Sequence, residues 1–151
     1  MITIDKKEGL QPQIHQNLLI QVVNTVFEHL AVVDALDVTV YLTDNEEITA
    51  LNAEWMGTGA PTDVLSFPSE EMDVDTGNQY LGDIVISTQK ALEQAEANGH
   101  SLEDECKLLV VHGMLHLFGF DHSTDDEKAE MWKIQKQILT KLQIDHIKIS
   151  E

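Results

Sequence analysis

One segment, residues 102–119, constrains the fold more than any other part of the chain. Ser101 with Asp104 three residues later forms a capping box that starts a helix here. The helix becomes apolar on nearly every side at residues 108–111, LLVV. A helix without a polar face must be covered by other elements. The sequence therefore predicts a central, buried helix that runs to Gly119.

Four more helices are predicted from apolar residues spaced three and four apart, or from residues that start and stop helices. The first covers residues 14–30, with Pro12 suited to its first turn, and the second is a short helix that is capped by Thr43 or Asp44 and ends at residues 57–61. The third covers residues 88–98 and ends at Gly99. The last is an amphipathic helix that is capped by Ser123 or Thr124, with Met131, Ile134, Ile138 and Leu142 on its apolar face.

Four short apolar or alternating segments predict strands. They are residues 2–4, 38–42, 64–67 and 81–86. Because strands and helices are interspersed along the chain, we expect an α+β fold, a small mixed four-stranded sheet packed with about five helices. A length of 151 residues suits one domain with a sizeable core, so residues 1–151 are expected to form a single unit.

The charge of the chain limits what it can bind. There are 27 acidic residues against nine basic ones, all lysine, and the formal net charge is −18. Such a surface repels phosphate backbones and anionic membranes, which excludes non-specific nucleic-acid binding through a broad basic face. No continuous apolar run follows the first seven residues, so neither a signal peptide nor a membrane span is predicted, and the cytoplasm is the expected compartment.

Histidines are the strongest candidates for metal ligands. Cys106 is the only cysteine, which excludes an internal disulfide and a cluster of thiolate ligands. His112 and His116 lie four residues apart, so they share one face of the central helix. Gly119 can end that helix in the left-handed conformation and let His122 return to the same point. The spacing predicts a zinc site at the end of the central helix, held by these three histidines.

The number of ligands favours a catalytic metal. Structural zinc sites usually have four protein ligands, whereas three leave a position for water, whose pKa zinc lowers to about 7. Cys106 is out of register with His112, so the sequence offers no obvious fourth protein ligand. Asp121 either holds the second nitrogen of an imidazole or is a turn residue. The other four histidines are isolated and are expected on the surface or on helix faces: His15, His29, His100 and His146.

The residue after the first histidine argues against one class of zinc enzyme. The spacing of His112, His116, Gly119 and His122 matches that of the metzincin proteases, in which a glutamate follows the first histidine and acts as general base. Here that residue is Gly113. Without the base, peptide hydrolysis is not the expected reaction.

Several blocks of the chain resemble the YbeY family of bacterial ribosomal RNA maturation factors, which are metal-dependent endoribonucleases. Residues 112–122, HGMLHLFGFDH, resemble the family signature, residues 61–68, PTDVLSFP, a second block, and residues 81–87, LGDIVIS, a third. With Leu51, Asn52 and Met131, the resemblance runs from about Val38 to Leu139.

The resemblance implies a compact α+β fold, one zinc ion on His112, His116 and His122, and cleavage of single-stranded RNA at the 3′ end of the small-subunit ribosomal RNA. It also implies a part in late ribosome assembly and quality control, with ribosomal proteins or assembly factors as partners. Neither a membrane nor DNA is expected as a partner. Whether water or a ribose 2′-hydroxyl attacks phosphorus is left open, and no residue is assigned as catalytic.

The chain departs from the family at one position. Met56 stands where many members have an arginine, and no lysine lies between Lys7 and Lys90. Methionine cannot bind a phosphate or stabilise charge on it. Positive charge must then come from the metal, from later lysines such as Lys90 or Lys107, or from a partner. Asp63 and Asp83, in the matching blocks, either orient water or a histidine or serve as cap and turn residues.

Two functions therefore remain in view. The first is a zinc-dependent endoribonuclease of ribosomal RNA processing. The alternative is a zinc-containing ribosome assembly or quality-control factor that binds RNA and protein with weak or no intrinsic cleavage, which Met56 and the acidic composition favour.

Overall fold

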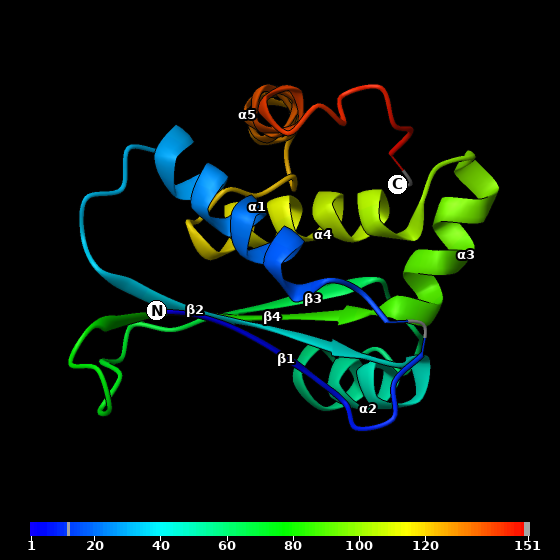
Figure 1. Ribbon diagram of the computed structural model, residues 1–151, viewed down its shortest axis with the longest axis horizontal. Helices are drawn as coiled ribbons and strands as arrows, with labels where there is room; N and C mark the ends of the chain where they lie inside the picture. The colour runs from blue at the N-terminus through cyan, green and yellow to red at the C-terminus, as the bar shows by residue number, and fades with distance from the viewer. Residues whose placement is uncertain (12, 150–151) are drawn as a thin grey trace.

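A computed structural model describes residues 1–11 and 13–149, and in this part of the chain four strands form one sheet with five helices around it (Figure 1). The elements in chain order are β1 (Ile2–Lys6), α1 (Gln16–His29), β2 (Leu36–Thr43), α2 (Asn45–Met56), β3 (Val64–Pro68), β4 (Gln79–Ser87), α3 (Thr88–Asn98), α4 (Leu102–Leu117) and α5 (Asp125–Lys141). The predicted α+β class, strands and helices are confirmed. Pro12, predicted for the first turn of α1, lies outside the described residues.

The sheet is mixed, as predicted, with strand order β1-β2-β4-β3. Strand β2 pairs in parallel with β1 and with β4, whereas β3 pairs antiparallel with β4. The parallel pairs require crossover connections, which α1 supplies between β1 and β2. Strand β3 is left at the edge of the sheet.

The helices form layers on the two faces of the sheet. Figure 1 shows α1 and α4 over one face, α2 over the other, and α5 stacked outside α1 and α4, in agreement with the contacts between these elements. Helix α4 is enclosed between the sheet and α5, and Val110, Val111, Met114 and Leu115 have no exposed surface. The predicted central helix is therefore the middle of the core.

The capping residues decide between the alternatives left by the sequence. The side chain of Asp44, not Thr43, accepts a hydrogen bond from the backbone N–H of Glu47 at the start of α2. Thr124, not Ser123, caps α5 in the same way. Ser101 caps α4 as predicted. No helix of the described residues is long and apolar enough to cross a membrane.

Helix α4 lies close to the sheet at Gly113. A Cβ atom there would lie 2.9 Å from Cγ2 of Ile84 on β4 and 3.2 Å from Oγ of Ser66 on β3. The Ser66 hydroxyl donates a hydrogen bond to the Gly113 carbonyl over 3.2 Å. A glutamate, the base of the metzincins, has no room at this position. The glycine instead holds the histidine-bearing end of α4 against β3 and β4.

Candidate metal centre

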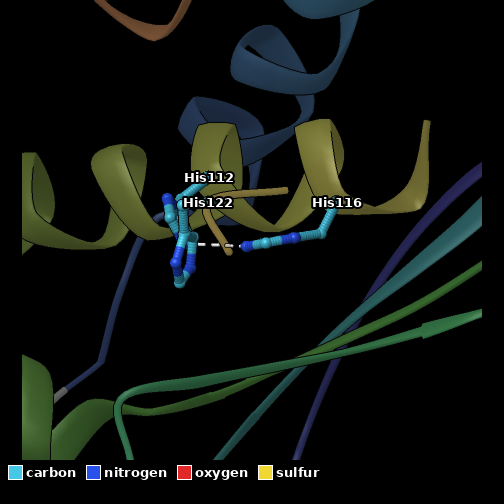
Figure 2. A group of neighbouring side chains, drawn as sticks. All are labelled: His112, His116 and His122. Carbon is cyan, nitrogen blue, oxygen red and sulfur yellow. Dashed lines mark hydrogen bonds between the residues drawn. The ribbon is translucent and has the colours of Figure 1, made fainter. Parts of the chain in front are cut away.

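The three predicted histidines meet at the C-terminal end of α4 (Figure 2). Their candidate ligand atoms all lie within 4.8 Å of one another, and Nε2 of His112 is 3.1 Å from Nε2 of His116. Gly119 has a φ of +94°, so the chain turns at the predicted residue and brings His122 back beside His112. The described residues thus place three imidazoles where one metal ion could bind.

A glutamine on α5 determines the tautomer of His112. Oε1 of Gln135 lies 3.0 Å from Nδ1 of His112, and an amide oxygen can only accept, so Nδ1 carries the proton and donates it. Nε2 is then left as the lone-pair nitrogen that faces the other two rings, which fits metal ligation. Sequence reasoning missed Gln135. The available signal was a polar residue in the otherwise buried stripe of Met131 and Ile138.

Burial favours the neutral form of the two helical histidines. Burial lowers the pKa of His112, although the hydrogen bond to Gln135 raises it in part, and the charge of His116 also lowers it. Burial also lowers the pKa of His116, as does the charge of His122. The Trp132 ring packs at steep angles against His112 and His122, with ring centroids 5.8 Å and 5.6 Å away. Neutral imidazoles are the ligand form, so the donor set suits a divalent metal such as zinc.

Asp121 lies in the turn that carries the third histidine. Its carboxylate accepts hydrogen bonds from the backbone N–H of His122 over 2.7 Å and from the Ser123 hydroxyl over 2.8 Å. These bonds, the first above all, lower the pKa of Asp121. The geometry is that of the turn residue, the second of the two roles expected, and it fixes the backbone from which His122 projects.

Two cavities meet at the histidines. One, of about 520 Å³, runs between β3 and the histidine-bearing turn, and all three histidines line it. The other, of about 380 Å³, lies between α4 and α5 and is lined by His112, His122, Trp132 and Lys128 among others. Asp63 lines both. A chain molecule laid along the first cavity would therefore pass the candidate ligands with a side pocket next to them.

A buried polar cluster anchors Asp63. The Gln94 amide donates to the carboxylates of Asp63 and Glu105, over 3.2 Å in each case. Nε2 of His100 lies 3.1 Å from the other oxygen of Glu105, and their side chains are 6% and 0% exposed. Burial raises the pKa of Glu105. The expected surface position of His100 is therefore wrong, because α3 and α4 enclose it.

The two aspartates of the matching blocks lie in different places. Asp63 reaches the candidate site, while Asp83 accepts a hydrogen bond from the hydroxyl of Tyr80 and lines neither of the two cavities. The Tyr80 hydroxyl also contacts the Thr39 hydroxyl. Asp83 therefore has a structural role within the sheet and is not part of the candidate site.

The lysine at the candidate site is neither of the two that the sequence suggested. Met56 is 49% exposed at the end of α2 and lines neither cavity. Lys90 lies 3.8 Å from Glu93, and Lys107 3.7 Å from Asp104. Lys128, on α5, is the lysine that lines a cavity at the histidines.

Comparison with known proteins agrees with this arrangement. The family model for Endoribonuclease YbeY matches residues 1–143. Among curated relatives, the Endoribonuclease YbeY of Renibacterium salmoninarum is 45% identical over 127 residues, 81% of each chain, and that of Thermoanaerobacter sp. strain X514 is 40% identical over 155 residues, 95% of this chain and 98% of the relative. The solution structure of TM1509 from Thermotoga maritima superposes with a TM-score of 0.60 at 26% identity, covering 97% of this chain and 94% of that one. The chain therefore belongs to the Endoribonuclease YbeY family.

Proposed function

We propose that this chain is a zinc-dependent endoribonuclease that cleaves single-stranded RNA at the 3′ end of the small-subunit ribosomal RNA and acts in late ribosome assembly. The observation that carries the proposal is the set of three histidines, open toward a cavity, in a member of an endoribonuclease family. We further propose that residues 1–151 form one hydrolase domain and that it works in the cytoplasm with ribosomal proteins or assembly factors.

In this proposal His112, His116 and His122 hold the metal, and their chemistry as neutral imidazoles suits zinc. When bound, zinc would polarise a phosphoryl oxygen and lower the pKa of a water molecule at the scissile phosphate. Gln135 keeps the ring of His112 in the ligating tautomer. The cavity along β3 admits the RNA strand to the three histidines.

The test compares cleavage and metal content in the same preparations. Wild-type protein and the His116→Ala variant are loaded with zinc, measured by elemental analysis, and incubated with single-stranded RNA. We expect about one zinc per wild-type chain, a lower content in the variant, and cleavage by the wild type alone. Equal cleavage by both proteins would defeat the nuclease proposal, and equal zinc content would defeat the ligand assignment. Cyclic 2′,3′-phosphate ends on the products would identify the ribose hydroxyl as the nucleophile.

A second function has support of its own. The net charge of −18 and the exposed Met56 favour a ribosome assembly or quality-control factor that holds zinc and cleaves weakly or not at all. This function predicts that zinc-loaded protein co-sediments with small ribosomal subunits and leaves naked RNA intact. Efficient cleavage of naked RNA that His116→Ala abolishes would exclude it.

A further inference from the structure

The side pocket between α4 and α5 has the features of a nucleotide site. We propose that it receives the unstacked base next to the scissile phosphate, that Trp132 stacks on this base, and that Lys128 contacts the phosphate of the same nucleotide. The inference rests on the proposed function, since it names the part of an RNA substrate that this pocket would hold. It also supplies the cation that Met56 cannot provide.

The size and position of the pocket suit one nucleotide. Its volume is about 380 Å³, within the range of pockets that bind small organic molecules. His112 and His122 form part of its wall, so a base inside it lies beside the candidate metal site. A base held in a duplex cannot enter such a pocket, which fits a substrate whose bases are free to leave the stack.

Trp132 is placed to bind a base by its ring. It is half-buried on α5, it lines the pocket, and its indole ring contacts the rings of His112 and His122. Stacking on an aromatic side chain suits any base, because every base has a π-face, and is worth about 1–3 kcal/mol per base. The indole therefore offers affinity without requiring one base.

Charge places the phosphate at the outer end of the pocket. Lys128 is exposed, its Nζ lies 5.5 Å from the centroid of the Trp132 ring, and no other described lysine lines either cavity at the histidines. The inner wall carries Asp63 and Glu105, whose carboxylates would repel a phosphate. A nucleotide in this pocket is thus oriented with its base inward and its phosphate toward Lys128.

The inner wall also offers hydrogen-bond partners to a base. Gln94 and Gln135 line it, and Gln135 is only 1% exposed. While Oε1 of Gln135 is engaged by His112, Nε2 has no hydrogen-bond partner among the described residues. A buried amide donor without a partner is costly, and an acceptor on the edge of a base would satisfy it while Oε1 stays on His112.

The experiment uses the indole as its own reporter. The chain has two tryptophans, so in zinc-loaded Trp55→Phe protein the fluorescence comes from Trp132 alone. We expect saturable quenching by each of the four ribonucleoside monophosphates at millimolar concentrations. In that background Lys128→Gln should weaken binding of the monophosphates by about fivefold, the upper end for an exposed ion pair, and leave nucleosides unaffected. Lys133→Gln, at an exposed position on the same helix, is the matched control and should change neither.

Two outcomes would overturn the assignment. One is the absence of saturable quenching by any monophosphate, and the other is equal weakening by Lys128→Gln and Lys133→Gln. The result is separable from that of the proposed function. Zinc-dependent cleavage of RNA without nucleotide quenching would overturn the assignment of the pocket and leave the nuclease proposal standing. Nucleotide binding that Lys128→Gln weakens, without any cleavage of RNA, would support the assignment of the pocket and overturn the nuclease proposal.

Discussion

Oε1 of Gln135 accepts a hydrogen bond from Nδ1 of His112, over 3.0 Å, so a residue of α5 decides which nitrogen of a residue on α4 faces the other two histidines. Helix α5 therefore contributes to the candidate metal centre although it carries none of the candidate ligands. The orientation of His112, the first candidate ligand, depends on how α5 packs on α4.

Replacement of Gln135 by leucine should weaken zinc binding about 10- to 100-fold, as expected when the hydrogen-bond partner of a ligand histidine is lost. Gln135→Glu should keep the affinity, because a carboxylate also accepts from Nδ1. Competition with a chromophoric chelator measures both dissociation constants. Gln137→Leu is the control, since that amide contacts His29 instead. Equal affinity in Gln135→Leu and the wild type would show that the hydrogen bond does not orient the ligand.

Gly113→Ala should destabilise the fold by about 1–3 kcal/mol, the usual cost of adding a methyl group to a packed contact. The new Cβ would lie 2.9 Å from Cγ2 of Ile84, so α4 or β4 must shift. Urea unfolding followed by circular dichroism gives the change in the free energy of unfolding. Gly59→Ala is the matched control, because nothing lies within 4 Å of its Cβ position and it should be nearly neutral. Identical stability in both variants would mean that α4 does not rest on the sheet as described.

Glu105→Leu should lower the free energy of unfolding by about 1–3 kcal/mol, because it leaves the buried Nε2 of His100 without its acceptor. Glu105→Gln retains an acceptor oxygen and removes the cost of a buried charge, which already raises the pKa of the native carboxyl. The glutamine variant should therefore lose clearly less stability at neutral pH. The same urea titration compares the two, and a leucine variant as stable as the wild type would contradict the role given to this cluster.

The elements of the fold could be predicted because their signals are local. Spacings of three and four, alternation, and the caps Asp44, Ser101 and Thr124 each act within a few residues. The candidate ligands could be predicted for the same reason, since His112, His116 and His122 lie on one helix and the turn after Gly119.

The rest of the site depends on contacts between distant segments. Gln135 and Trp132 reach the histidines only because α5 packs on α4, and no local pattern specifies that docking. His100 is buried because α3 and α4 pack together. The sequence shows that Gly113 stands where the metzincins have a glutamate base. The reason for a glycine there is its close packing against Ile84 of the sheet, which the sequence does not reveal.

Stability should decrease as the pH falls below about 6.5. The pKa values of His112 and His116 are lowered from 6.5 in the folded chain, chiefly by burial, so in this range the unfolded chain binds more protons than the folded one. These two histidines therefore do not change the free energy of unfolding at a pH above their pKa in the unfolded chain, and they lower it as the pH falls below that pKa. Zinc should steepen the fall, because protons compete with the metal for the same nitrogens. Thermal melting from about pH 8 to about pH 5, with zinc and with chelator, measures both effects, and His116→Gln should flatten the zinc-dependent part. Melting temperatures that respond neither to acid nor to chelator would contradict neutral, metal-binding histidines at this site.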